Sequence, residues 1–196
     1  MAPMWYRVRV APAHPCHPAV FLDRDDTLLA NREVTANTAH PGDLVDPSLA
    51  RLLPGAGAAC RRLRDSGFKL IIVSNQGGVA MGVCTLAQVE AVNDRLRELL
   101  AEHGVELAGI YYSPARPGGT VARFAHPDPW RKPAPGMILA AAAELDIDLT
   151  RSWMVGDAPR DCEAGASAGI APVRCLLVGE GMPFADVGAA AAHILG

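Results

Sequence analysis

Short apolar runs alternate along this chain with Ala- and Leu-rich segments that have helical spacing. The clearest run is residues 69–74, in which four consecutive apolar residues stand between a Lys and a Ser. A strand that is apolar on both sides must be covered on both faces of its sheet, which is typical of parallel sheets with helices on either side. The pattern therefore predicts an α/β protein, a Rossmann-like three-layer sandwich with a mainly parallel central sheet.

The apolar runs and the turn residues between them place the individual elements. We expect strands at residues 19–23, 69–74, 109–112, 153–155 and 173–178, and helices at residues 54–66, 85–103, 135–145 and 160–168, with a short Ala-rich helix near the end of the chain that packs onto the sheet. Thr85 and Gln88 fit a capping box at the start of the second helix. Residues 31–53 and 114–130 form long loops, which are usually functional in a compact domain, but neither is large enough for a lid domain.

Composition and charge exclude several classes of protein. A chain of 196 residues suits one domain, which we expect at residues 19–196 after a flexible N-terminal leader at 1–18. The net charge of -3 argues against a nucleic-acid partner. A membrane span is also not expected, because the chain has no run of about 18 uninterrupted apolar residues. Five Cys without a CxxC pair indicate a reduced, cytoplasmic chain. We expect a monomer or a small homo-oligomer.

The first apolar run ends in two carboxylates, Asp23 and Asp25. Because side chains alternate along a strand, residues two apart point to the same side. Two like charges so close are unfavourable unless a cation neutralises them, and carboxylate oxygens suit a hard ion such as Mg²⁺. A carboxylate nucleophile, a second carboxylate as acid/base and Mg²⁺ are the components of a phosphoryl-transfer site.

Three later segments supply further polar groups at predicted strand ends, where open α/β sheets bind their ligands. Residues 74–78 follow the second strand, and their hydroxyl and backbone N–H groups can hold phosphate oxygens. Lys132 precedes a helix and can supply positive charge. Asp157 and Asp161 form a second acidic pair after the fourth strand, although Asp161 could instead cap the following helix.

The order of these pieces resembles the haloacid dehalogenase-like (HAD) phosphohydrolase superfamily over residues 19–178. The resemblance implies a HAD-like sandwich without a large cap domain, with Asp23 as nucleophile and Asp25 as acid/base. It implies Mg²⁺ bound by Asp23, the main-chain carbonyl of Asp25, and Asp157. The phosphate- and substrate-binding residues that it implies are Thr27, Ser74, Asn75, Gln76, Arg131 and Lys132, with Asp161 in a supporting role.

Finer motifs are similar to those of one subgroup, the heptose 1,7-bisphosphate 7-phosphatases and histidinol-phosphate phosphatases. These motifs are FLDRDDTL (21–28), VSNQGGVAMG (73–82), YYSP (111–114), RKPAPGMI (131–138) and VGDAPRDCEAG (155–165). They imply a Mg²⁺-dependent phosphomonoester hydrolase that acts on a small phosphorylated metabolite, with a heptose bisphosphate as first choice. The alternatives are histidinol phosphate or another sugar or polyol phosphate, and a non-catalytic protein that binds a phosphorylated ligand on the same fold.

The chain departs from the subgroup's pattern at three places. Asp26 stands where Gly is usual, and we expect its side chain to point to solvent rather than to change the turn or add a carboxylate to the site. The positions of the subgroup's zinc loop are Ser113, Ala115, Asp128 and Trp130. We therefore expect no zinc and a loop held by prolines and by packing of Trp130. Met81 replaces an Arg, which weakens the case for a second phosphate on the substrate.

Overall fold

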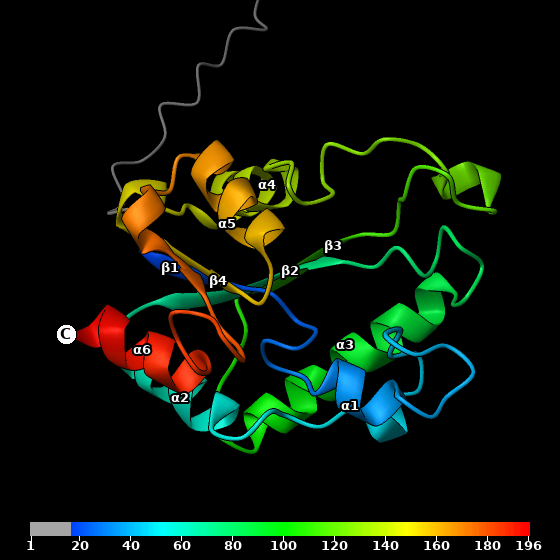
Figure 1. Ribbon diagram of the computed structural model, residues 1–196. Helices are drawn as coiled ribbons and strands as arrows, with labels where there is room; N and C mark the ends of the chain where they lie inside the picture. The colour runs from blue at the N-terminus through cyan, green and yellow to red at the C-terminus, as the bar shows by residue number, and fades with distance from the viewer. Residues whose placement is uncertain (1–16) are drawn as a thin grey trace, which may run out of the picture.

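Five parallel strands form the centre of the protein, in the order β3-β2-β1-β4-β5 (Figure 1). The strands are β1 (Ala19–Leu22), β2 (Lys69–Asn75), β3 (Gly109–Ser113), β4 (Trp153–Gly156) and β5 (Cys175–Leu177). This computed structural model describes residues 17–196, so most of the predicted leader lies outside the described residues. The predicted α/β fold is confirmed, and no large cap domain interrupts the described part of the chain.

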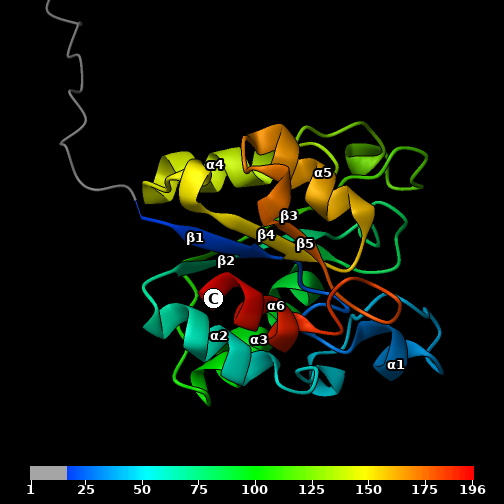
Figure 2. The same ribbon diagram turned by 60° about the vertical axis from the view of Figure 1, so that its left-hand side comes forward.

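Helices cover both faces of the sheet and complete three layers (Figures 1 and 2). The helices are α1 (Asn31–Thr35), α2 (Ala56–Asp65), α3 (Leu86–Ala101), α4 (Gly136–Leu145), α5 (Pro159–Ala168) and α6 (Val187–Leu195). Val20 and Leu22 pack with α2, α3 and α6 on one face, whereas Ala19 and Phe21 pack with α4 and α5 on the other. The alternation of β1 thus separates two cores. In the described residues, no helix has both the length and the apolar character that crossing a membrane requires.

Most predicted elements agree with the structure to within a few residues. Thr85 caps α3, where its Oγ1 accepts a hydrogen bond from the Gln88 backbone N at 3.2 Å and its own N donates to Gln88 Oε1 at 3.0 Å, as a capping box requires. The last strand begins at Cys175 rather than at residue 173, because Pro172–Arg174 form a 3-10 turn that proline favours at its start. Helix α1 lies inside a predicted loop and was not expected. Helix α6 packs onto the sheet as predicted.

The long loop after β3 is closed by a polar contact between its two ends. Ser113 is fully buried, and its hydroxyl donates to Asp128 Oδ2 at 2.5 Å. The other carboxylate oxygen of Asp128 accepts a hydrogen bond from the Trp130 backbone N at 3.0 Å. The Trp130 ring lies against Tyr111, with 6.1 Å between ring centroids. A hydroxyl, a carboxylate and an aromatic contact therefore hold together the positions at which the subgroup places zinc ligands.

Replacing Asp128 tests how much this contact stabilises the protein. Asp128→Ala leaves the buried Ser113 hydroxyl without its acceptor, so we expect the free energy of unfolding to fall by about 1–3 kcal/mol in urea denaturation. Asp94→Ala on α3 is the matched control, because Asp94 is paired with Arg97 on the surface and should change stability by less than about 0.5 kcal/mol. Equal urea midpoints for Asp128→Ala and the wild type would show that the loop is held by other contacts.

Candidate active site

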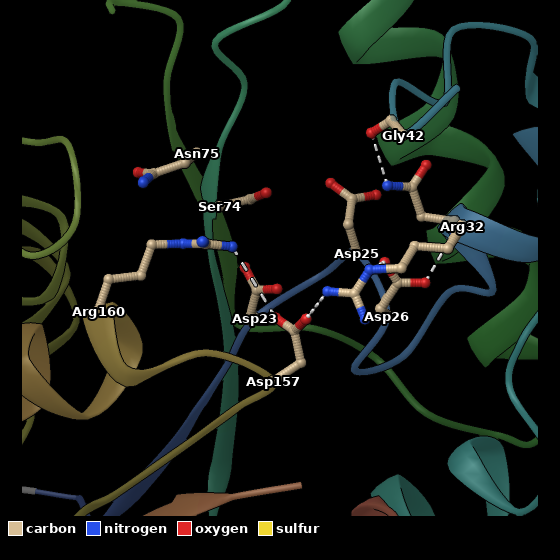
Figure 3. A pocket seen from close by; sticks show the side chains of 10 residues that line it. Asp23, Asp25, Asp26, Arg32, Gly42, Ser74, Asn75, Asp157 and Arg160 are labelled. Atoms are coloured by element: carbon tan, nitrogen blue, oxygen red, sulfur yellow. Dashed lines mark hydrogen bonds and ion pairs between the residues drawn. The ribbon is translucent and has the colours of Figure 1, made fainter. Parts of the chain in front are cut away.

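A polar cavity of about 190 Å³ lies at the carboxyl ends of β1, β2 and β4. Its lining residues are Asp23, Asp25, Asp26, Asn31, Arg32, Gly42, Ser74, Asn75, Asp157 and Arg160 (Figure 3). The first acidic pair comes from the segment after β1, the Ser-Asn pair from the end of β2, and Asp157 from the segment after β4. The structure therefore brings together at one edge of the sheet the polar groups that the sequence placed at separate strand ends.

Lys132 is buried beneath this cavity between two carboxylates. Its Nζ lies 2.5 Å from Asp23 Oδ1 and 2.7 Å from Asp161 Oδ1, and it donates to the Val73 carbonyl at 2.6 Å. The second oxygen of Asp161 accepts a hydrogen bond from the Ala158 backbone N at 3.0 Å, at the start of α5. Asp161 therefore both caps the helix and pairs with the lysine, so the two roles considered for it coexist.

The charges of this cluster depend on one another. Burial acts to lower the pKa of Lys132, but the carboxylates of Asp23 and Asp161 outweigh it and leave the pKa raised, so the lysine stays cationic. Burial raises the pKa of the Asp23 carboxyl, and Lys132 opposes that rise. A buried carboxylate of this kind needs a nearby cation to remain ionised.

Asn75 positions the lysine through its backbone. The Asn75 side-chain amide donates to the Lys132 carbonyl at 2.9 Å, and its Oδ1 accepts a hydrogen bond from the Lys132 N at 2.9 Å. This two-way contact joins the end of β2 to the segment before α4. Asn75 therefore supports Lys132 in addition to lining the cavity.

Asp25 is held on the far side of the cavity by two neighbours. Gln76 Nε2 donates to Asp25 Oδ2 and to Ser74 Oγ, both at 2.8 Å. Arg24 donates from Nε to Asp25 Oδ1 at 3.2 Å and from Nη2 to Asp25 Oδ2 at 3.1 Å. Gln76 is buried and is absent from the cavity lining, so it holds Asp25 and Ser74 in place instead of facing the cavity as a substrate-binding residue would.

The carboxylates of Asp23, Asp157 and Asp161 can hold a divalent cation. Each offers one oxygen, and these oxygens lie within 4.8 Å of one another. The Asp157 Oδ1 atom is buried without a hydrogen-bond partner and lies 4.0 Å from Arg160 Nη2. Because Lys132 and the α5 backbone already use the Asp161 oxygens, Asp23 and Asp157 are the better ligands. Hard oxygen donors around an unsatisfied buried carboxylate oxygen fit Mg²⁺.

Asp26 lies in the cavity wall, so the expectation that it points to solvent is wrong. Its Oδ1 accepts a hydrogen bond from the Arg32 N at 2.8 Å, and its Oδ2 lies 3.3 Å from Arg32 Nε. The Asp26 side chain caps the first turn of α1, for which Ala30 has no capping side chain. Asp26 has φ of +58°, a left-handed conformation that Asp tolerates better than most residues other than Gly. Arg32 Nη2 continues to Asp157 Oδ2 at 2.6 Å (Figure 3).

Like Gln76 and Lys132, the predicted binding residues Thr27 and Arg131 are not among those that line the cavity. The Thr27 hydroxyl is buried without a hydrogen-bond partner. Arg131 donates to the Ala115 carbonyl at 2.9 Å, and burial together with Arg116 and Arg160 lowers its pKa. Conversely, several residues at the cavity or in contact with Asp25 and its neighbours were not predicted from the sequence: Arg24, Asn31, Arg32, Gly42, Asn93 and Arg160. The sequence contained a signal for two of them: Arg24 stands between two predicted site carboxylates, and Arg160 follows Asp157 by three residues.

Removing the buried ammonium group should cost much stability. Lys132→Met leaves Asp23 and Asp161 close together without their cation, so we expect a loss of about 3–5 kcal/mol in the free energy of unfolding, measured by urea denaturation without Mg²⁺. Lys69→Met is the control, because the only other lysine of the chain donates to the Leu145 carbonyl and has no ion pair among the described residues. Equal losses for both variants would contradict the central role of the cluster.

Comparisons with known proteins agree with this site. Residues 129–193 match the family described as "HAD-hyrolase-like". The chain is 40% identical over 175 residues to the D-glycero-beta-D-manno-heptose-1,7-bisphosphate 7-phosphatase of Yersinia pestis, covering 89% of this chain and 87% of that protein. It is 44% identical over 156 residues to the D-glycero-D-manno-heptose-1,7-bisphosphate 7-phosphatase of Thermosynechococcus vestitus, covering 78% and 75%.

A solved structure shares the fold as well. The D,D-heptose 1,7-bisphosphate phosphatase of B. bronchiseptica, crystallised with magnesium and phosphate, superposes with a TM-score of 0.72 and 28% identity over 91% of this chain and 98% of that chain. The level of identity and the near-complete coverage are those of one family, and the cavity carries the acidic and basic groups that phosphate ester hydrolysis requires. The chain therefore belongs to the HAD-like phosphatases, and it is a phosphoric monoester hydrolase.

Proposed function

We propose that this phosphatase removes one phosphate from a bisphosphorylated sugar, with D-glycero-D-manno-heptose 1,7-bisphosphate as the first candidate and its 7-phosphate as the group removed. The names of the relatives support the heptose. The observation that carries the proposal is the arrangement of Asp23, Asp25 and Asp157 around one cavity, with Lys132 beneath it. This arrangement provides a nucleophile, an acid/base and a cation site within reach of one phosphoryl group.

The reaction proceeds in two displacements at phosphorus. In the first, an oxygen of Asp23 forms a bond to phosphorus while the bond from phosphorus to the sugar oxygen breaks, and Asp25 gives its proton to the departing alkoxide. In the second, water attacks the aspartyl phosphate, its proton passes to Asp25, and the bond between phosphorus and Asp23 breaks. One water is consumed, inorganic phosphate leaves, and both carboxyl groups return to their initial states.

The remaining groups stabilise charge during both displacements. Ser74 lines the cavity and Lys132 contacts the cavity residue Asp23, so both can hold the phosphoryl oxygens that do not react. Mg²⁺ bound by Asp23, Asp157 and the main-chain carbonyl of Asp25 would neutralise part of the charge of phosphate and carboxylate. The magnesium and phosphate bound to the B. bronchiseptica relative support this metal. That this chain binds no zinc stays a prediction.

Arginine side chains at and near the cavity favour a substrate with a second anionic group. Arg32 and Arg160 line the cavity from opposite sides, and Arg131 lies near Arg116 behind the turn at Gly77. These guanidinium groups suit a second phosphate and disfavour histidinol phosphate, which carries an ammonium group. They can take the place of the Arg that the subgroup has at the position of Met81, so the bisphosphate remains the better candidate.

The cysteines bear on the compartment in which the enzyme works. Cys60, Cys84, Cys162 and Cys175 are free thiols in the described residues, as expected in a reducing compartment. A small phosphorylated sugar in that compartment is the expected partner. We therefore propose a cytoplasmic enzyme that works as a monomer or a small homo-oligomer.

Phosphate release measured across a panel of substrates tests the function. The panel contains a heptose 1,7-bisphosphate, sugar monophosphates, histidinol phosphate and nucleotides, each with Mg²⁺. We expect the heptose bisphosphate to have the highest kcat/KM, by at least about tenfold, because cavity arginines pair with its second phosphate. A higher kcat/KM for histidinol phosphate would keep the reaction but contradict the substrate.

Asp23→Asn is the blank in the same assay. The amide is a poor nucleophile, so we expect turnover to fall by at least about a thousandfold while the protein stays folded, because Lys132 keeps Asp161 as its partner. An Asp23→Asn protein that retains most activity would refute the nucleophile. If the wild type binds Mg²⁺ but releases no phosphate from any compound of the panel, another phosphate ester would be favoured as the substrate.

A further inference from the structure

Arg24 is a fully buried arginine that the reaction described above does not use. It follows Asp23, and its side chain lies on the face of the sheet to which Val20 and Leu22 contribute, toward α3. The carboxylates on either side of it turn toward the cavity (Figure 3). Burying a guanidinium group is costly unless its hydrogen bonds are satisfied, so a buried arginine at this position calls for a specific role.

The Arg24 guanidinium contacts three side chains from different parts of the chain. Two of its N–H groups bind the two oxygens of Asp25, at 3.2 and 3.1 Å. Nη2 also donates to Gln76 Oε1 at 2.9 Å, and Nη1 donates to Asn93 Oδ1 on α3 at 2.9 Å. Asp25 is the only carboxylate within 4 Å of Arg24 among the described residues. A planar guanidinium with two parallel bonds fixes the plane of a carboxylate as well as its position.

We propose that Arg24, anchored to α3 by Asn93, is a positioning residue that orients the Asp25 carboxyl toward the leaving oxygen of the substrate. This inference rests on the proposed role of Asp25 as acid/base. Asp25 is partly exposed at the cavity, with 21% of its side chain accessible, so without a support it could turn to solvent. Gln76 joins Asp25 to Ser74, so the acid/base and the predicted phosphate-binding hydroxyl are held by one network.

Asn93 serves this network only as an acceptor. Its side chain is buried, its Oδ1 receives the Arg24 hydrogen bond, and its Nδ2 has no hydrogen-bond partner in the described structure. Asn93→Asp keeps an acceptor oxygen in a side chain of the same shape, with a charge opposite to that of Arg24, whereas Asn93→Leu fills similar space without an acceptor. Asn93→Asp and Asn93→Leu therefore separate the hydrogen bond from the packing on α3.

The chemistry of the leaving group reveals whether Asp25 is correctly oriented. A sugar alkoxide needs a proton as it departs, whereas p-nitrophenolate leaves without one, and kcat/KM reports the step in which the leaving group departs. We expect Arg24→Lys and Asn93→Leu to lower kcat/KM for the sugar bisphosphate by about 10- to 100-fold and for p-nitrophenyl phosphate by less than about threefold. Asn93→Asp should recover most of the loss, because it restores the acceptor.

Two reference variants and one binding measurement make the result decisive. Asp25→Asn gives the difference in kcat/KM between the two substrates that complete loss of the acid produces. Arg97→Ala, a surface change on α3, should change kcat/KM for neither substrate. Mg²⁺ affinity by titration calorimetry should stay within about twofold of the wild type in the Arg24 and Asn93 variants.

The outcomes distinguish this inference from the proposed function. Equal losses on both substrates for Arg24→Lys and Asn93→Leu, or no loss on either, would overturn the positioning role while Asp25→Asn still shows its leaving-group effect. Equal losses on both substrates for Asp25→Asn itself would instead remove the acid role of Asp25, and the inference would fall with it. Activity of Asn93→Asp as low as that of Asn93→Leu would also overturn the positioning role, because the acceptor for Arg24 would be present without supporting the site.

Discussion

One ammonium group compensates two buried carboxylates that come from distant parts of the chain. Lys132 precedes α4, Asp23 follows β1 and Asp161 lies at the start of α5, so the three segments meet only in the folded protein. Each of these charges would be costly to bury alone, and they become tolerable only when all three meet with good geometry. The contact that joins the sheet to the α4 and α5 layer therefore also places Asp23, the proposed nucleophile.

Side chains alternate between the two faces of the sheet along β1, so the site also contacts the other helical layer. Phe21 faces α4 and α5, Leu22 faces α2, α3 and α6, and the residues that follow continue the separation. Asp23 meets the lysine on one side of the sheet, while Arg24 reaches Asn93 of α3 on the other. The catalytic edge is thus supported by both helical layers, which is a way of holding carboxylates rigidly without a cap domain.

Two departures from the family's pattern are compensated by direct contacts between side chains. Asp26 caps α1 and pairs with Arg32, which reaches on to Asp157 at the cavity. Ser113 and Asp128 join the ends of the loop where the subgroup has zinc ligands. In both cases a pair of polar side chains holds the backbone where the family's pattern uses another residue type, and the five-stranded sheet is kept.

Local patterns in the sequence were sufficient for the succession of strands and helices along the chain, apart from α1, for the capping box at Thr85 and for the acidic groups at the strand ends. These features depend on residues a few positions apart, and parallel sheets gather their strand ends at one edge. The orientations of Asp26, Gln76, Arg131 and Arg24 were decided only by the tertiary structure. Each depends on a partner supplied by another segment: Arg32 in an unexpected helix, Ser74 and Asp25 together, the Ala115 carbonyl, and Asn93, which lies 69 residues away. A sequence shows which side chains can form such bonds, but the partner is chosen by the distances between packed layers, because a hydrogen bond forms only within about 3 Å.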